Sequence, residues 1–241
     1  MLVSEALDTR FTCRAFLPTP VARETVEAVL KGAGRAPSGG NFQPWWVWAL
    51  AGEELERLKA IVAGKIAAGQ FTDGDFEYQI FPADKEPYAT RRFRNGEGMY
   101  QAIDTGRDDG AGRFEQYKRN FQFFGAPVGL FIAIDRAMLQ GQWADLGLFL
   151  QSLMLVAREQ GLHTAPLESW SLFHRTVRDF VGMPDDLMLF CGVAIGHADM
   201  DAPINRVRAE RQPLAEWAVM RGFEEAPPVT PRAVAASPVD R

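Results

Sequence analysis

Apolar residues recur along this chain in two patterns, short continuous runs and a helical spacing of three to four residues. Three continuous runs, at residues 45–50, 128–134 and 187–195, are rich in Val, Ile, Phe or Trp and predict β-strands. The third run is almost entirely apolar, which favours burial on both faces of a sheet.

The helical spacing predicts several helices. Leu55, Leu58, Ile61, Val62 and Ile66 recur on one side of a predicted helix that ends before Gly69. A longer predicted helix, residues 143–160, has apolar residues over most of its circumference, which places it in the middle of the core. The shorter predicted helices are one capped by Ser4, one that begins at Thr19 and Pro20 and stops at Gly32 and Gly34, one around residues 114–121, and one at about 172–181 ended by Gly182 and Pro184.

The organisation of the chain follows from two stretches that break these patterns. Residues 70–122 are rich in Gly, Asp, Arg and Tyr and weakly periodic, and we interpret them as an excursion that covers a functional site. Residues 224–241 contain four prolines and no periodic apolar residues, which predicts a loosely ordered C-terminal tail. A single domain is therefore predicted for residues 1–223.

Composition narrows the function classes. The 241-residue chain is 47% apolar, which is ample for a sizeable core. Its net charge is −5 and its 26 Lys and Arg residues are scattered, which argues against a nucleic-acid surface. No apolar run of about 18 residues and no signal-peptide pattern occurs, so we expect a soluble protein that does not bind membranes. Cys13 and Cys191 stand far apart in no metal or redox spacing, which favours a reducing compartment, the cytosol.

The most informative polar positions lie near the N-terminus. Arg10, Thr12 and Arg14 alternate, so an extended segment would present all three on one face. Two guanidinium groups and a hydroxyl suit a phosphate or another anion. An isolated segment of this kind is more often the polar face of a strand.

A second informative stretch is residues 37–45, PSGGNFQPW. Its small residues let the backbone approach a flat ligand closely, and Ser38, Asn41 and Gln43 can hydrogen-bond the edges of that ligand. The stretch is not a phosphate loop or a dinucleotide fingerprint, because no G-K-[ST] follows and Gly32-Ala33-Gly34 lacks the third glycine. The alternative is an ordinary turn.

Both stretches, together with Pro166-Leu167-Glu168-Ser169-Trp170 and the arginine-rich run at 205–214, resemble the signature of the nitroreductase-like flavoproteins. The resemblance covers roughly residues 2–50 and 125–220. It implies an α+β fold with a central, mostly antiparallel sheet flanked by helices. It also implies an obligate homodimer that binds FMN without a covalent bond at its interface.

The resemblance implies a cofactor-binding set drawn from both ends of the chain. Arg10 and Thr12 would hold the phosphate and ribityl end of FMN together with Arg208 and Arg211, although a charged run of this kind is usually a solvated face. Arg14 would lie beside the pyrimidine edge, where a fixed cation stabilises the reduced ring. The loop at 37–45 would contact the flavin of the partner subunit. The complete implied set is Arg10, Phe11, Thr12, Arg14, Pro37, Ser38, Gly39, Asn41, Gln43, Pro166, Leu167, Glu168, Ser169, Arg208 and Arg211.

The resemblance also implies a catalytic position. The backbone amides of Glu168 and Ser169 would face flavin N5, the atom that takes and gives hydride. The common family pattern has glycine after the glutamate, so Ser169 is a departure from it.

The implied activity is a ping-pong reaction in which NAD(P)H, a transient co-substrate, reduces the flavin and an electron-poor acceptor then reoxidises it. Nitroaromatics are the default acceptors, because an apolar aromatic slot over a flavin suits flat, electron-poor rings. An arginine in the excursion would favour nitrobenzoates. The alternatives are reduction of enones or quinones, dehalogenation, breakdown of the flavin, or a non-enzymatic flavin-binding role.

The histidines and Cys13 are weaker candidates for a role in catalysis or metal binding. His163, His174 and His197 form no compact ligand pattern, so no metal is predicted. Positive charge near Cys13 would lower its pKa, but the alternation directs the thiol away from the ligand face.

The excursion offers candidates for a substrate pocket, although none matches a family position. These are Tyr88, Arg91, Arg92 and Asn95. The aromatic residues Phe121, Phe123 and Phe124 either cover the exposed face of the flavin or pack in the core.

Overall fold

The computed structural model describes residues 1–223 of the chain. It divides into two compact units, Met1–Arg208 and a second unit that begins at Ala209. The described part of the second unit contains a short 3-10 turn, η5 (Leu214–Glu216), and a hydrogen bond from Trp217 Nε1 to the carbonyl of Gln212. The predicted tail at 224–241 lies outside the described residues, and the predicted domain limit at 223 stays a prediction.

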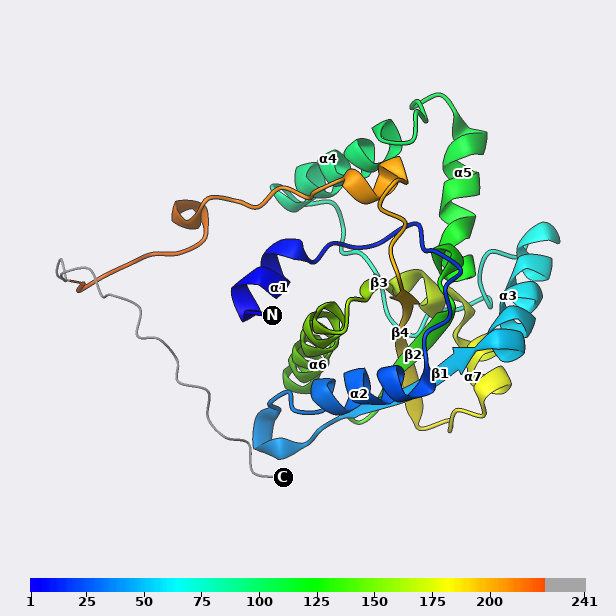
Figure 1. The fold of residues 1–241 in the computed structure, drawn as a ribbon, viewed down its shortest axis with the longest axis horizontal. Coiled ribbons are helices and arrows are strands. Elements are labelled where there is room, and N and C mark those ends of the chain that lie inside the picture. Colours follow the sequence, from blue (N-terminus) through cyan, green and yellow to red (C-terminus); the bar gives the residue numbers. More distant parts are fainter. Residues whose placement is uncertain (224–241) are drawn as a thin grey trace. The chain divides into compact units, whose positions relative to one another are not determined.

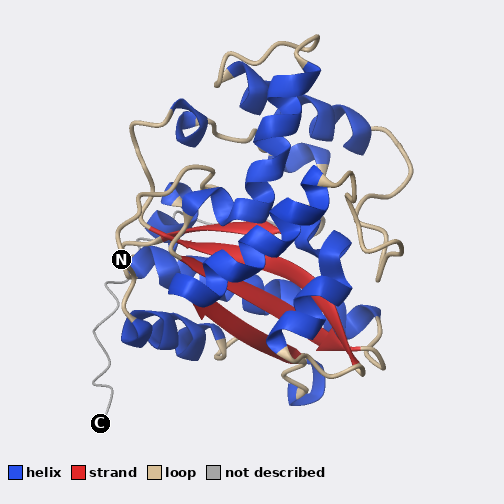
Figure 2. Cartoon of the chain, turned by 90° about the vertical axis from the view of Figure 1, so that its right-hand side faces the viewer, coloured by secondary structure: helices blue, strands red, loops and turns tan. Residues whose placement is uncertain are grey.

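The first unit is built on a four-stranded sheet, shown in red in Figure 2. The strands are β1 (Trp45–Ala51), β2 (Val128–Asp135), β3 (His163–Leu167) and β4 (Leu187–Gly196), in the order β1-β2-β4-β3. Each neighbouring pair is antiparallel. The predicted α+β class and its antiparallel sheet are confirmed, and the three predicted strands are β1, β2 and β4.

Strand β3 was not predicted. It has only five residues and contains Pro166, whose missing N–H weakens the strand signal in the sequence. Among the strands of the sheet β3 pairs with β4 alone, so it is an edge strand, where proline is tolerated.

Helices surround the sheet in the first unit (Figure 1). They are α1 (Val3–Thr9), α2 (Arg23–Ala33), α3 (Gly52–Ala67), α4 (Tyr88–Gln101), α5 (Gly110–Lys118), α6 (Gln140–Glu159) and α7 (His174–Val181). Shorter 3-10 turns are η1 (Gly39–Asn41), η2 (Arg119–Gly125), η3 (Glu168–Phe173) and η4 (Pro203–Arg206). None of the helices in the described residues combines the length and apolarity that crossing a membrane requires.

Two predicted helix starts are wrong. Helix α1 begins after Leu2, and the Glu5 carboxylate accepts a hydrogen bond from the Leu2 N–H at 3.3 Å, so Ser4 is not the cap. Helix α2 begins at Arg23, several residues after the predicted start at Thr19 and Pro20. In both cases a cap-forming residue type occurs near the helix without occupying the capping position.

The excursion holds more helix than its sequence predicted. Helix α4 was missed because it buries no residue and so carries no apolar stripe. The helix predicted at 114–121 lies earlier, as α5, because the Asp109 carboxylate caps it by accepting from the Gly112 N–H at 2.8 Å. The chain then continues into η2.

Helices α2 and α6 pack together against one face of the sheet. Val26 and Val29 of α2 and Phe149 and Leu153 of α6 are buried there with alternate residues of β2, such as Leu130 and Ile132. Alternation along β2 sends Phe131 and Ala133 to the other face, against α3, η2 and η3. Strands β2 and β4 are therefore buried on both faces, as predicted for the run at 187–195.

Two glycines bring η2 and η3 close to the sheet. A Cβ at Gly192 would lie 2.6 Å from Trp170 Cδ1, and one at Gly129 would lie 2.7 Å from Phe123 Cζ. The rings of Phe123 and Trp170 stack with centroids 4.8 Å apart over these glycines. This close packing fixes the turn that follows β3.

A β-bulge in β4 redirects one side chain. Ile132 pairs with Cys191 and Ala133 with Leu189, so Phe190 has no partner in the ladder. Its carbonyl accepts a hydrogen bond from the Tyr78 hydroxyl, which ties the excursion to the sheet.

Candidate active site

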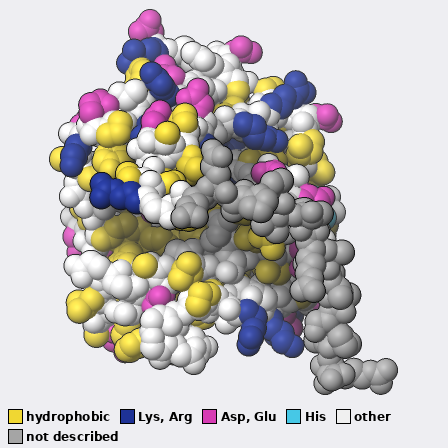
Figure 3. All heavy atoms as spheres, turned by 90° about the vertical axis from the view of Figure 1, so that its left-hand side faces the viewer, with side chains coloured by type: hydrophobic (Ala, Val, Ile, Leu, Met, Phe, Trp, Pro, Cys, Tyr) yellow, Lys and Arg dark blue, Asp and Glu magenta, His cyan; other side chains and the backbone are white. Residues whose placement is uncertain are grey.

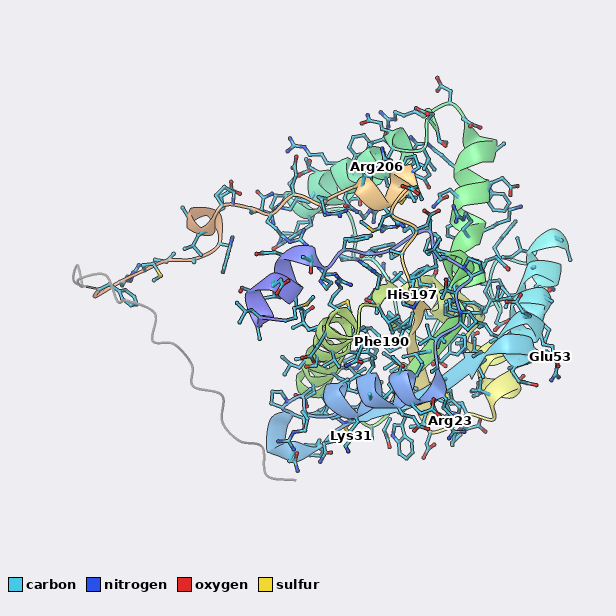
Figure 4. The ribbon with its side chains drawn as sticks, in the orientation of Figure 1. Arg23, Lys31, Glu53, Phe190, His197 and Arg206 are labelled. Carbon is cyan, nitrogen blue, oxygen red and sulfur yellow. The ribbon has the colours of Figure 1, made fainter. Side chains whose placement is uncertain are left out.

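A cavity of about 620 Å³ lies in the first unit. This volume lies in the range of pockets that enclose small organic ligands. The bulge residue Phe190, labelled in Figure 4, is one of its walls. The lining residues are Arg14, Ile80, Phe81, Met99, Tyr100, Gln116, Tyr117, Asn120, Phe124, Leu150, Pro166, Leu167, Glu168, Ser169, Leu172, Phe190 and Cys191.

The predicted N-terminal motif is extended and alternates in burial. Phe11 and Cys13 are buried, whereas Arg10, Thr12 and Arg14 are half-buried. The segment runs beside β3, since Thr12 bridges to Thr164 and the Cys13 N–H donates to the Thr164 carbonyl at 3.0 Å. Of the three polar residues, only Arg14 lines the cavity.

Arg14 is a desolvated cation at this cavity. Burial lowers the pKa of its guanidinium, because the charged form loses part of its hydration. Its Nη1 donates to the Thr12 carbonyl at a long 3.4 Å, and its backbone N–H donates to Asn205 Oδ1 at 2.8 Å. The backbone is thus fixed while most of the guanidinium donors stay available to an anionic ligand.

The turn from β3 into η3 forms another wall. Pro166, Leu167, Glu168 and Ser169 all line the cavity, as the sequence grouped them. Trp170 is fully buried and its Nε1 donates to the Asn120 carbonyl at 3.1 Å, which holds the turn in place.

Two side chains of this turn are chemically unusual. Burial raises the pKa of the Glu168 carboxyl, because the charged form loses hydration. The Ser169 Oγ is buried and has no hydrogen-bond partner among the described residues. A buried hydroxyl without a partner is costly, so a ligand oxygen or nitrogen would be favoured beside it.

Of the arginines assigned to the phosphate end, Arg208 lies against Phe11. The Arg208 guanidinium carbon is 4.2 Å from the centre of the Phe11 ring, and the ring of His163 is 4.9 Å from the same ring. Burial, together with Arg158 and Arg208, lowers the pKa of His163 to about 4. The imidazole is therefore neutral at pH 7. Arg10 Nη1 lies 3.9 Å from Met154 Sδ on α6.

The loop at 37–43 is not part of this cavity. Gly39 donates its N–H to Asp145 Oδ1 at 3.1 Å, and Ser38 Oγ accepts from the Gln43 N–H at 2.9 Å. Asn41 and Gln43 adopt positive φ angles of 59° and 49° in this exposed loop. Such angles are uncommon outside glycine, so the loop holds a defined shape at some cost. Gln43 lines a separate hollow of about 260 Å³, and Pro37 and Ser38 line neither.

Several predicted residues lie elsewhere. Arg211 belongs to the second unit, where its Nη1 donates to the carbonyls of Ala209 and Glu210. Tyr88, Arg91, Arg92 and Asn95 are exposed and do not line the cavity, although Arg92 stacks on the ring of Phe81, which does.

The aromatic cluster serves mainly as core. Phe121 and Phe123 are fully buried, and only Phe124 lines the cavity. Cys13 is also buried, and burial raises the pKa of its thiol to about 11, opposite to the lowering expected from nearby charge. Its placement away from the ligand face agrees with the alternation.

Comparison with known proteins decides the family. The model of the Nitroreductase family matches residues 7–197. The chain belongs to the nitroreductase family. The family predicted from the sequence motifs is confirmed.

Relatives in this family share most of the chain. A 4-nitrobenzoate reductase of Pseudomonas putida is 37% identical over 216 residues, which cover 89% of this chain and 93% of that protein. A chloronitrobenzene nitroreductase of Comamonas testosteroni is also 37% identical, with 89% and 95% covered. The crystal structure of the FMN and NADPH-dependent nitroreductase NfnB from sphigopyxis sp. strain HMH superposes with a TM-score of 0.89 at 43% identity, covering 92% of this chain and all of that one.

Sequence reasoning missed many of the residues that line the cavity. Seven come from the excursion, Ile80, Phe81, Met99, Tyr100, Gln116, Tyr117 and Asn120, and others from core elements that reach the same space. No local pattern marks them, because they are spread over a loop, α4, α5 and η2. The one available signal was the composition of residues 70–122, which indicated a cover over a site.

The residues of this cavity fit a flavin. An apolar space of this volume suits a planar ring, the desolvated Arg14 suits an electron-rich edge, and the unpartnered Ser169 hydroxyl suits a ring heteroatom. The apolar body with few polar groups is typical of cofactor pockets.

Proposed function

We propose that this chain is an FMN-dependent NAD(P)H oxidoreductase that reduces nitroaromatic compounds. The carrying observation is that Arg14 and the Glu168–Ser169 turn, far apart in sequence, meet in one apolar cavity of a nitroreductase-family chain. Relatives named for 4-nitrobenzoate and chloronitrobenzene, at 37% identity over nine-tenths of the chain, support the acceptor class.

The proposed binding residues divide by charge and position. Arg14 lies at the pyrimidine edge, Arg10 and Arg208 take the phosphate with Thr12 and Phe11 beside them, and the backbone amides of Glu168 and Ser169 face the reactive edge. Pro166 and Leu167 give that edge an apolar wall. Arg211 stays in the proposal as a further phosphate ligand.

When bound, FMN accepts two electrons from NAD(P)H and delivers them to the acceptor. The chain itself positions the ring, keeps water from the apolar walls and holds a positive charge where negative charge develops. Reduction of a nitro group to a nitroso group consumes two electrons and two protons and releases water. No side chain is assigned as the proton donor.

We propose a homodimer that completes this site. Exposed apolar side chains lie on α1 and α6, including Val3, Leu7 and Leu148. Figure 3 looks onto the side of the first unit where α1 and α6 lie, and hydrophobic side chains gather there. Apolar surface of this kind marks association.

A dimer also gives the loop at 37–43 a role. Within one chain its residues Pro37, Ser38, Gly39 and Asn41 do not line the cavity, and Gln43 lines a different hollow. We propose that the loop reaches the flavin of the partner subunit. The fixed and exposed conformation of the loop supports this proposal.

We propose a cytoplasmic location as well. Cys13 and Cys191 are both buried free thiols. Unpaired cysteines are typical of reducing compartments.

The deciding experiment is anaerobic rapid mixing of the purified yellow holoprotein with NADPH or NADH. We expect the visible flavin band to bleach and to return on addition of 4-nitrobenzoate. A holoprotein whose band neither reductant bleaches would refute the reductase activity. Return of the band with an enone but not with 4-nitrobenzoate would assign a different acceptor class.

A further inference from the structure

Gln116 is a buried polar residue at the wall of the cavity. It lies on α5, its side chain is only 6% exposed, and it lines the 620 Å³ cavity. Its Nε2 is buried and has no hydrogen-bond partner among the described residues. Leaving a buried amide unpaired is unfavourable, so a fold without a ligand to satisfy would favour an apolar residue here.

Several other polar groups at or beside the cavity have hydrogen-bond partners, whereas the Ser169 Oγ has none among the described residues. Asn120 Nδ2 donates to the Tyr117 carbonyl at 2.7 Å, and the Tyr78 hydroxyl behind Phe190 donates to the Phe190 carbonyl. Arg14 donates to the Thr12 carbonyl. The Gln116 amide is thus a neutral donor held ready beside apolar and aromatic walls.

The origin of Gln116 in the chain indicates what it contacts. The residues proposed to hold the flavin come from the N-terminal segment and from the turn after β3. Gln116 comes from the excursion, together with Phe81, Met99 and Tyr100, whose side chains suit an aromatic ring. Its amide hydrogens require an acceptor atom on that ring.

We propose that Gln116 determines acceptor specificity by donating a hydrogen bond to a nitro or carboxylate oxygen of the bound aromatic compound. This inference rests on the proposed function. It assigns Gln116 to substrate recognition and not to retention of the flavin.

The test measures binding without turnover. Oxidised holoprotein is titrated with 4-nitrobenzoate and, separately, with nitrobenzene, in the absence of NAD(P)H, and the change in the flavin spectrum gives each Kd. Gln116→Met keeps the length and flexibility of the side chain and removes its donors. We expect the Kd of 4-nitrobenzoate to rise about tenfold, the effect of one lost hydrogen bond to a charged oxygen.

The two ligands locate the contact. A rise for both would assign the nitro oxygen, and a rise for 4-nitrobenzoate alone would assign the carboxylate. A second variant, Gln116→Glu, keeps the shape but can only accept when ionised, so it should weaken 4-nitrobenzoate binding at least as much. Gln122→Leu is the matched control, because Gln122 lies on η2 outside this cavity and its Nε2 meets the Lys59 carbonyl at 3.5 Å. It should leave both Kd values unchanged.

Two results would overturn the inference. One is an unchanged Kd for both ligands in Gln116→Met and Gln116→Glu. The other is a Kd for FMN that weakens as much as the Kd for 4-nitrobenzoate, because Gln116 would then hold the cofactor. Wild-type protein that binds FMN and is bleached by NADPH keeps the proposed function in either case, whereas a wild type that binds no FMN would remove both.

Discussion

Arg14 and Arg208 differ in their surroundings, and the difference predicts different roles. Arg14 is desolvated and lines the cavity, so its charge acts on a ring held there. Arg208 is exposed and rests on the Phe11 ring, where it can turn toward a phosphate. The alternation of the N-terminal motif could be predicted from sequence, but its division between cavity and rim could not.

This division leads to a prediction for Arg208→Ala. Loss of one charge-assisted hydrogen bond should weaken FMN binding about ten- to a hundredfold. Riboflavin, which lacks the phosphate, should bind equally to wild type and variant, as titrations of the apoprotein would measure. Arg206→Ala is the control, since Arg206 is exposed, donates to the Asp201 carbonyl and lies well away from Phe190 in Figure 4. Equal weakening of riboflavin and FMN would contradict a phosphate role.

At the scale of elements, the excursion is fixed to α7 by acidic residues. Asp73 accepts from the Thr176 N–H and hydroxyl, each at 2.8 Å, and from Lys65 Nζ at 2.7 Å. His174 lies between two carboxylates, with Nε2 2.9 Å from Asp75 Oδ1 and Nδ1 2.8 Å from Glu77 Oε1. This attachment brings the following residues, Ile80 and Phe81, to the cavity.

These contacts predict an acid-sensitive cover. Burial alone would raise the pKa of Asp73, but hydrogen bonds from Lys65 and Thr176 outweigh it and the pKa is lowered. Arg136 and His174 similarly outweigh burial and lower the pKa of Glu77. A carboxylate whose pKa is lowered in the folded state stabilises the fold at pH values above its unfolded-state pKa. This contribution to stability is lost as the pH falls through the folded-state pKa. Hydrogen exchange of residues 73–81 should therefore accelerate below about pH 4.

The matching variant is Asp73→Asn, which keeps the shape and removes the charge. It should lower the free energy of unfolding by roughly 2 kcal/mol at pH 7, the low part of the range because Lys65 is partly exposed. It should also reduce the acid dependence, as denaturant unfolding at pH 7 and at about pH 3 would measure. Asp84→Asn is the control, because the exposed Asp84 carboxylate lies 3.9 Å from Arg92. This variant should change neither the free energy of unfolding nor its acid dependence. An acid dependence equal to that of the wild type would show that other groups loosen the cover.

At the scale of the whole molecule, the proposed site divides between two chains. In the proposed homodimer the cavity belongs to one chain and the loop at 37–43 to its partner, so symmetry would create two equivalent sites per dimer. Changing the loop on one chain should therefore affect the flavin of the other.

A subunit-mixing experiment tests this arrangement. Asn41→Ala and Arg14→Ala should each give paler homodimers. In heterodimers formed by coexpression, one site carries both changes and the other carries neither, so about a quarter of all sites should return to wild-type flavin affinity. Mixtures no more yellow than the average of the two homodimers would place loop and cavity of one site in the same chain.

The sequence by itself determined three of the four strands, the long core helix and the family, because these depend on local periodicity and on short motifs of fixed spacing. The runs at 45–50, 128–134 and 187–195 became β1, β2 and β4, since continuous apolar residues have to be buried wherever the chain folds. The same reasoning grouped Arg14 with Glu168 and Ser169 through a family motif.

Only the tertiary structure decided which residues share the cavity. Gln116 lies on the capped helix α5, Tyr100 on α4, which buries no residue, and Phe190 at the bulge of β4. No local sequence pattern marks any of the three as a cavity residue. Their convergence depends on long-range contacts, such as Trp170 over Gly192 and Asp73 against α7, that form between segments far apart in sequence. Periodicity reports the burial of a residue, whereas a binding site depends on which distant segments that burial brings together.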